Sequence, residues 1–184
     1  MNKLRLVTIL VAATAMMTSC RRDSKESLQS AEDNAQIETE YSQIYDAVAD
    51  YASTDSRTGK TDDYILPSGA TVTFTDSTFN DGDGVDFTID YGLLDHGAAY
   101  KGLLCKDGRY RSGKVHVGLT SHWSDIPCTL TIAISAADDY HVGNGTKMYK
   151  LTGTKVVQRT SATDYSVTVT DATLQRDNGI VSWD

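Results

Sequence analysis

Proline and cysteine are scarce in this chain of 184 residues, which contains two prolines and three cysteines. No stretch rich in proline, or in glycine and serine together, divides the sequence into two parts of domain size. The 165 residues that follow residue 19 suit one domain with a hydrophobic core of its own. The sequence therefore predicts a single domain on a tether.

Positive charge is scarce as well, since 17 lysines and arginines stand against 25 aspartates and glutamates and the net charge is -8. Without residues 1–19 the net charge falls to -10, because this segment carries Lys3 and Arg5 and no acidic residue. Nucleic-acid binding depends on basic side chains that neutralise several phosphates. No group of basic residues is dense enough here, so we exclude a nucleic-acid partner.

Long hydrophobic runs are missing except for one near the N-terminus. Two basic residues precede an apolar run from Leu6 to Met16, and Met17-Thr18-Ser19-Cys20 follows it. Such a run is too short to span a hydrocarbon layer of ~30 Å. A positive start, a short apolar core and small residues before a cysteine are the pattern of a bacterial lipoprotein signal peptide. We expect cleavage of residues 1–19 and acylation of Cys20, by palmitate or similar chains, as an anchor in the outer membrane.

Two further cysteines, Cys105 and Cys128, would then lie in an exported and oxidising compartment, where disulfides form. Cys128 opens an expected strand, whereas Cys105 lies ahead of the preceding strand. Simple hairpin pairing does not place the two opposite each other. The sequence therefore leaves a disulfide between them open.

Residues 20–63 are predicted to contain the lipid anchor, a polar spacer and one amphipathic helix. Apolar side chains recur at steps of three and four residues from Ile37 to Tyr51, including Tyr41 and Ile44, which predicts a helix of about residues 27–52. Tyrosine suits a seam at which the ring is buried and the hydroxyl stays near water. We expect this stripe to pack on the domain that follows.

From residue 64 to residue 184 the apolar period changes to two, which predicts strands. About seven are expected, near residues 70–74, 85–91, 115–119, 130–136, 149–157, 165–169 and 180–183. Short connections rich in glycine and asparagine favour antiparallel neighbours. We predict a mainly β fold, an antiparallel meander arranged as a curved sheet or a sandwich, with the helix over part of one face.

Two stretches of the chain resemble a family of envelope lipoproteins common in Bacteroidota. They are Ala31-Glu32-Asp33-Asn34 and the segment from Cys105 to Val115, with its Asp107-Gly108-Arg109 turn. The signal, the strand Phe87 to Gly92, the Gly153-Thr154 step and Trp183 follow in the same order. The resemblance implies an outer-envelope location and a β domain, and it supplies no reaction, substrate or catalytic residue.

The side of the outer membrane stays open. In the lipoproteins that this chain resembles, an acidic tract directly after the lipidated cysteine favours export to the cell surface. Here the tract Arg21-Arg22-Asp23-Ser24-Lys25-Glu26 is mixed in charge. It therefore does not decide between the periplasmic side and the cell surface.

The segment from Asp107 to Arg111 is the strongest binding candidate. Arg109 and Arg111 alternate along an incipient strand, and arginine forks pair with carboxylates and phosphates. Together with Tyr110 and Trp123 they are the candidate binding residues, for a glycan or for another envelope protein. The favoured interpretation is instead that the arginines pair with some of the surface aspartates and fix the register of the turn.

Metal and catalytic motifs are weaker. Asp81, Asp83 and Asp86 offer oxygen ligands for calcium, but the EF-hand spacing is missing and a solvated hairpin turn is favoured. No pair of histidines has zinc-binding spacing, so we predict no metal and no cofactor. Pieces of a triad occur without a nucleophile elbow. These pieces are Ser121-His122 and Asp95-His96. Asp138 and Asp139 beside His141 form a second mixed cluster, for which a solvated turn is again favoured. His116 and His122 share a strand face but lie too far apart to bind one metal.

We therefore predict a non-catalytic binding or structural module, held at the outer membrane by the lipid on Cys20. An exposed aromatic patch around Tyr110, Trp123 and Tyr140 would support this function. The alternative is an envelope hydrolase that uses Asp95 or Asp138 with a histidine in a cleft of the β domain.

Overall fold

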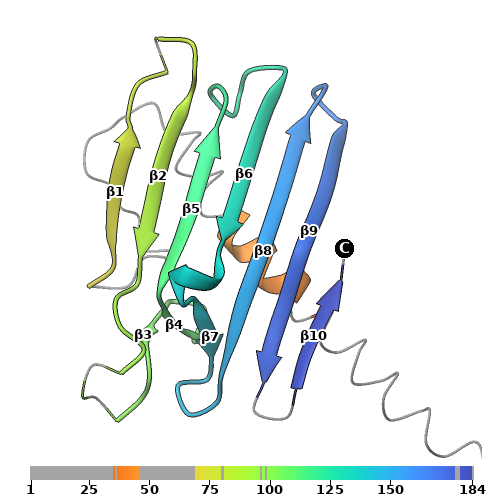
Figure 1. The fold of residues 1–184 in the computed structure, drawn as a ribbon. Coiled ribbons are helices and arrows are strands. Elements are labelled where there is room, and N and C mark those ends of the chain that lie inside the picture. The colour runs from red at the N-terminus through yellow and green to blue at the C-terminus, as the bar shows by residue number, and fades with distance from the viewer. Residues whose placement is uncertain are drawn as a thin grey trace, which may run out of the picture. The chain divides into compact units, whose positions relative to one another are not determined.

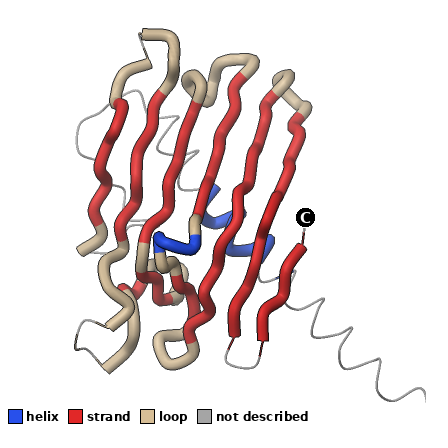
Figure 2. Tube along the Cα trace, in the orientation of Figure 1, coloured by secondary structure: helices blue, strands red, loops and turns tan. Residues whose placement is uncertain are grey.

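The alternation of apolar and polar residues in the second part of the chain produces one antiparallel sheet in the computed structural model (Figure 1). The structure describes residues 35, 37–45, 69–79, 81–95, 97, 99–176 and 179–183. The predicted signal peptide, Cys20, the spacer and both ends of the predicted helix lie outside these residues. Within them, one helix includes residues 37–45, and the strands occupy most of the rest (Figure 2).

Ten strands are present among the described residues, and the mainly antiparallel β class is confirmed. They are β1 Thr71–Asp76, β2 Val85–Asp90, β3 Leu103–Leu104, β4 Tyr110–Ser112, β5 Lys114–Leu119, β6 Cys128–Ile134, β7 His141–Gly143, β8 Met148–Arg159, β9 Tyr165–Arg176 and β10 Gly179–Trp183. The seven predicted strands correspond to β1, β2, β5, β6, β8, β9 and β10. The additional strands β3, β4 and β7 have two or three residues each, too few to show a period.

The long strand β8 organises the sheet. One of its edges pairs with β9 along most of its length, and β10 continues the sheet beyond β9. The other edge is shared, because residues 148–150 pair with β7 and residues 153–159 pair with β6. From β6 the sheet runs through β5 and β2 to β1, whereas from β7 it runs through β4 to β3.

The two faces of the sheet differ in polarity. Phe87, Val117, Ile132 and Lys155 lie in register across β2, β5, β6 and β8, and all four are buried. The helix covers this face with Ile37, Tyr41 and Ile44, as the apolar stripe predicted. In Figure 1 the helix, coloured orange, lies behind the sheet.

The opposite face carries threonines, as expected of a half-exposed sheet. One row across the strands, in register, contains Thr73, Thr88, His116, Ala133 and Thr154. The short 3-10 helix η2 (Ala136–Asp138) follows β6 and lies in front of the sheet in Figure 1. The covered face and the threonine face therefore carry different kinds of side chain, one available for a core and one for hydrogen bonding.

Gly153 permits the closest contact between the helix and the sheet. Its φ is +130°, and a Cβ there would lie 2.6 Å from Cα of Ala172 and 2.8 Å from the hydroxyl oxygen of Tyr41. The pairing of β8 with β9 shifts register at this point. A larger residue would force both neighbours apart, so the Gly153-Thr154 step has a packing reason.

The loops gather at the two ends of the strands (Figure 1). At one end, residues 77–84 join β1 to β2, residues 120–127 join β5 to β6, and residues 160–164 join β8 to β9. We name these three loops the aspartate end. Residues 92–113 and 143–147, which include β3, β4 and the turn before β8, form the tyrosine end. The two ends are separated by the length of the central strands.

Candidate functional site

Arg111, the strongest sequence candidate for binding, is buried beneath the helix. It is 1% exposed, and its guanidinium donates to both carboxylate oxygens of Asp107, at 3.0 and 2.7 Å. It also donates to Glu40 at 3.2 Å and to Gln43 at 2.7 Å, both on the helix. The fork that the sequence offered to an outside anion is therefore occupied by acceptors of the same chain.

Arg109 forms an ion pair with Glu40, which is 1% exposed. The carboxylate of Asp107 accepts the backbone N–H of Arg109 at 3.1 Å, so Asp107 fixes its own turn as well as Arg111. The favoured interpretation, that these arginines hold the turn, describes the structure better than an open anion site. Glu40 was not singled out from the sequence. Its position, three residues after Ile37 and four before Ile44, places it on the apolar stripe of the helix, and an acid on such a stripe indicates a buried cation as its partner.

The surroundings of Arg111 are aromatic and apolar. Tyr91 and Tyr140 are fully buried, with ring centroids 6.0 Å apart. Burial raises the pKa of Tyr140 to about 12, although the Arg111 charge opposes the rise. Burial also raises the pKa of the Cys105 thiol, again against Arg111. These groups stay protonated at neutral pH, so the network contains no available base among them.

The predicted aromatic patch around Tyr110, Trp123 and Tyr140 is not formed. Tyr140 belongs to the core and is fully buried, because it packs beside Tyr91. Tyr110 packs against Tyr100 at the tyrosine end, with the two rings tilted and their centroids 5.2 Å apart. Trp123 lies in the loop between β5 and β6 at the aspartate end. The four candidate binding residues therefore do not share one site.

Trp123 has aromatic neighbours of its own. Its ring meets Tyr45 of the helix edge-on at 5.5 Å and stacks on Tyr165 of β9 at 6.2 Å. Arg159 at the end of β8 donates to the backbone oxygen of Trp123 at 2.6 Å, which ties this loop to the β8–β9 turn. The result is a fixed aromatic pair, Trp123 and Tyr165, at the aspartate end.

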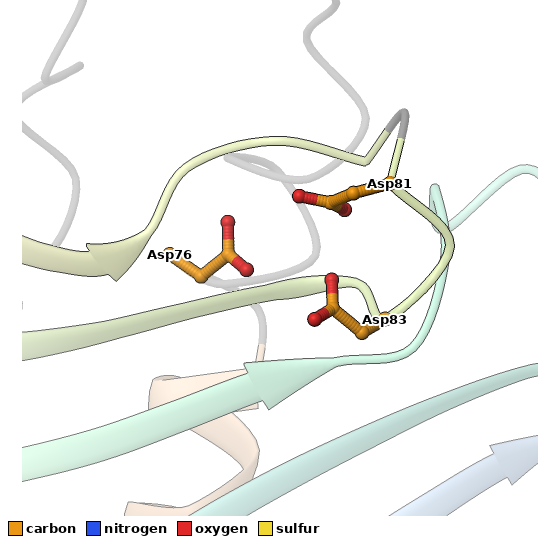
Figure 3. A group of neighbouring side chains, drawn as sticks. All are labelled: Asp76, Asp81 and Asp83. Carbon is orange, nitrogen blue, oxygen red and sulfur yellow. The ribbon is translucent and has the colours of Figure 1, made fainter.

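The acidic loop between β1 and β2 gathers Asp76, Asp81 and Asp83 (Figure 3). One carboxylate oxygen from each lies within 4.8 Å of the others, which makes them the one group of potential metal ligands among the described residues. Asp86, which the sequence grouped with them, instead lies on β2, where its carboxylate faces Gly118. The third acid of the group is Asp76.

Hydrogen bonds organise this loop. Thr78 donates its hydroxyl to Asp76 at 3.3 Å and to Asp81 at 2.5 Å. The bond from Thr78 lowers the pKa of Asp81, whereas hydrogen bonding to Asp81 and its charge raise the pKa of Asp83. The group has the oxygen chemistry that a hard cation prefers. Its internal bonds also fit the favoured sequence interpretation, a solvated turn.

A histidine and a carboxylate do meet on the threonine face. Nε2 of His116 lies 2.7 Å from a carboxylate oxygen of Asp138, and Nδ1 lies 3.0 Å from the hydroxyl of Thr88. The backbone N–H of Ser135 holds the second oxygen of Asp138 at 2.6 Å. Partial burial opposes ionisation of Asp138, but its bonds with Ser135 and His116 lower the pKa.

The sequence named Asp138 as a carboxylate that could act with a histidine, but it did not identify which histidine. His141 hydrogen-bonds the backbone oxygen of Asp139 at 2.7 Å, and the Asp139 carboxylate pairs with Lys150. The sequence does not show the residue-by-residue register of β5 with β6, so it could not predict that His116 lies near Asp138. The other triad pieces are used locally.

Those pieces make local contacts. Ser121 donates to the backbone oxygen of Pro127 at 3.3 Å, and the ring of His122 packs on Phe79 at 4.0 Å. Asp95 accepts the N–H of Gly97 at 3.1 Å, while His96 lies outside the described residues. Neither Ser121 nor Asp95 completes the arrangement that its sequence neighbourhood suggested.

Cys105 and Cys128 are both free and buried. Cys105 donates to the backbone oxygen of Leu103 at 3.7 Å at the tyrosine end, and Cys128 donates to that of Ser121 at 3.4 Å beside the aspartate end. A disulfide needs Cα atoms within about 7 Å. The structure therefore does not contain the bridge that the sequence left open.

No helix among the described residues combines the length and the hydropathy needed to cross a membrane. Comparison of the chain with protein-family models, with curated proteins and with solved structures gives no match. Functional interpretation therefore depends on the sequence pattern and on the geometry of these residues.

Proposed function

We propose that the chain is a lipid-anchored protein of the outer membrane, whose β domain binds a glycan or another envelope protein and does not catalyse a reaction. The location is supported by the signal pattern of residues 1–19 and by Cys20 directly after it. Several acyl chains on one cysteine hold a protein far more firmly than a single chain. The anchor leaves the β domain as the part that meets a partner.

One observation carries the binding role: Trp123 and Tyr165 stack at an end of the sheet where loops meet. The two rings come from different hairpins, and Arg159 fixes the backbone of one against the turn of the other. Binding residues commonly occupy loops that a rigid scaffold positions, and aromatic side chains dominate contact surfaces. Tyr165 and the nearby Ile126 are exposed, which makes part of this surface available.

The location is tested by growing cells with a labelled fatty acid and comparing the wild-type chain with Cys20→Ala. Label on the wild-type chain alone supports the anchor, and an unlabelled wild-type chain contradicts it. Protease treatment of intact cells then decides the side of the membrane. Digestion of the β domain in intact cells places it on the cell surface, whereas its survival until the cells are opened places it in the periplasm.

The binding role is tested by crosslinking in cells, followed by purification and identification of the attached molecules. We expect the same adduct in repeated preparations, and its loss in the Trp123→Ala and Tyr165→Ala variants. Ile180→Ala, at an exposed apolar residue of β10 that pairs with Gln175 near the other end of β9, is the matched control and should keep the adduct. Recovery of uncrosslinked monomer alone would argue against a binding partner.

A second function, hydrolysis, is favoured by the arrangement of Thr88, His116 and Asp138. With a proton on Nε2, His116 donates to Asp138 and can accept the proton of the Thr88 hydroxyl at Nδ1. The order of groups is that of a nucleophile, a base and an orienting carboxylate. The site lies on the threonine face of the sheet.

This second function is tested with panels of ester, amide and glycoside substrates. Turnover that disappears in both Thr88→Val and His116→Gln, and persists in His141→Gln, would establish it. Turnover that is equal in all four proteins would come from a contaminant and would reject it. Folding of each variant is checked by circular dichroism, so that loss of structure is not mistaken for loss of a catalytic group.

A further inference from the structure

The tyrosine end is joined into one surface by contacts between its segments. Tyr110 of β4 pairs across strands with Leu104 of β3, and its ring packs at a tilt against that of Tyr100. Lys101 donates its backbone N–H to the oxygen of Gly145 at 2.9 Å, which links this loop to the turn before β8. A Cβ on Gly145 would lie within 3.0 Å of both tyrosines, so the turn fits closely against them.

Large apolar side chains project into solvent here. Leu93 is 76% exposed, Leu104 is 54% exposed and Tyr100 is 51% exposed. Leu104 and Tyr110 lie on the side of their strands opposite to Arg111, which points to the core, because successive side chains alternate. The outward side of β3 and β4 is therefore an aromatic and aliphatic surface.

The tyrosine end is also basic in a chain that is otherwise acidic. Residues 92–113 and 143–147 contain five lysines and arginines and two aspartates, a net of +3, while the whole chain has -8. Arg109 and Arg111 are paired internally with Glu40 and Asp107. Asp90 and Asp139, which border this end, pair with Lys114 and Lys150. Lys101 and Lys147 are exposed, and Asp95 is the remaining acid within these segments.

The aspartate end has the opposite charge. Its three loops contain four aspartates and neither lysine nor arginine, a net of -4. The two ends of the strands therefore differ in charge sign, and such a separation orients a protein in an external field. A negatively charged surface attracts the tyrosine end and repels the aspartate end.

We propose that the tyrosine end docks on an anionic phospholipid surface, with Tyr100, Leu93 and Leu104 in the headgroup region and with Lys101 and Lys147 against the headgroup charges. Tyrosine suits this depth, because its ring is apolar and its hydroxyl stays wet. Lysines near a membrane are attracted by anionic lipids within a Debye length. The inference builds on the proposed anchor, which holds the domain at such a surface.

The choice of occupant follows from charge complementarity. Apolar residues alone would fit a protein or a lipid surface, but exposed lysines beside them favour a surface with negative charge. The opposite end, with its four aspartates, then faces away from the membrane and leaves the Trp123 and Tyr165 pair accessible. The lipid anchor keeps the β domain at the membrane, so that even a weak contact of the tyrosine end forms at a high effective concentration.

The test uses the acylated protein reconstituted in vesicles, with hydrogen exchange of residues 99–104 as the readout. Vesicles of phosphatidylethanolamine and phosphatidylglycerol are compared with vesicles of phosphatidylcholine alone. We expect exchange to be about tenfold slower on the anionic vesicles, and the difference to shrink at high salt. Equal exchange on the two kinds of vesicle would overturn the proposal.

Matched variants separate this surface from the anchor. Leu104→Ser, and Lys101→Glu combined with Lys147→Glu, should each abolish the slow exchange, while Val167→Ser, at an exposed apolar residue of β9, should leave it unchanged. All variants should still float with the vesicles through the lipid on Cys20. A protein that carries no lipid and does not float contradicts the proposed anchor. A wild-type protein that floats, but whose residues 99–104 exchange equally fast on the two kinds of vesicle, contradicts the docking surface only.

Discussion

Arg111 of β4 and Glu40 of the helix, which are 71 positions apart in the sequence, lie 3.2 Å apart, and each is 1% exposed. Gln43 and Asp107 supply further acceptors to the same guanidinium, and Arg109 supplies a second cation to Glu40. Burying a charged pair carries a desolvation cost that its attraction and hydrogen bonds offset, whereas a buried charge that loses its partner is strongly destabilising. The helix is therefore attached to the sheet by charge as well as by its apolar stripe.

Replacement of Arg111 by Met should lower the free energy of unfolding by about 3–5 kcal/mol, because Glu40 and Asp107 lose a partner in or near the core. Urea denaturation measures the loss. Lys114→Met is the control: it removes an exposed lysine 3.6 Å from Asp90 and should cost at most about 1 kcal/mol. Equal losses in the two variants would contradict the buried network.

Should Arg111→Met fail to fold, Glu40→Gln gives a milder test, since the amide keeps the shape of the side chain. We expect a loss of about 1–3 kcal/mol, because Arg111 and Arg109 would lose a charged acceptor. The same change at Glu38, which is largely exposed, should cost less. If Glu38→Gln were the more destabilising change, the interpretation of Glu40 would be wrong.

The sequence predicted the class of the fold because period and burial agree over long strands. Val115, Val117 and Leu119 alternate with polar residues, and all three are buried. The same reasoning could not find β3 and β4, because two or three residues carry no period. It also placed Arg109 and Arg111 on a surface, because the sequence alone does not show which strand face the helix covers.

Candidate sites were predicted less well than strands because they depend on register. The sequence proposed Asp138 with an unspecified histidine and noted His141 as its neighbour, whereas the 3-10 helix after β6 brings Asp138 to His116 of β5. Cys105 and Cys128 have a plausible spacing, yet they lie at different ends of the sheet. Predicting either result would have required the residue-by-residue register of the strands, which the sequence pattern does not provide.

Asp138→Asn should make the protein less stable at pH 7, by about 1 kcal/mol, since the carboxylate accepts from Ser135 and His116. Its folded pKa is lowered, so its contribution is present above the ordinary aspartate value of ~3.9 and is lost as the pH falls through the lower folded value. The difference between wild type and variant should therefore shrink below about pH 4. A difference that stays constant down to low pH would contradict this role.

Gly153→Ala should destabilise the protein by about 1–3 kcal/mol through overpacking, because the new methyl group meets Ala172 and Tyr41. Gly108→Ala is the matched control. Gly108 also has a positive φ, of +78°, but a Cβ there meets nothing within 4 Å. Thermal unfolding measures the loss of stability in both variants. The amount by which the loss in Gly153→Ala exceeds that in Gly108→Ala reports the close contact at Gly153. No excess would mean that the helix does not pack on Gly153.

Cys105 and Cys128 should be recovered as free thiols when the purified protein is denatured and alkylated without reductant. In the folded protein both should react slowly, because they are buried and because burial raises the pKa of Cys105. Mass spectrometry of the alkylated peptides measures both states. A peptide pair joined by a disulfide, released only by reductant, would contradict the structure.

Lys155→Met tests whether every buried cation on the covered face stabilises the fold. Lys155 is buried beneath the helix, its amine lies 5.9 Å from the centre of the Tyr41 ring, and its ion-pair partner among the described residues is Glu38, at 3.8 Å. Glu38 is largely exposed, so removal of the lysine charge leaves no buried carboxylate unpaired. Methionine keeps most of the aliphatic volume and does not carry the cost of desolvating an ammonium group. We therefore expect urea denaturation to give an unchanged or higher free energy of unfolding for Lys155→Met, the opposite of Arg111→Met. If Lys155→Met lowered the free energy of unfolding as much as Arg111→Met does, the amine would have stronger partners than Glu38 and Tyr41.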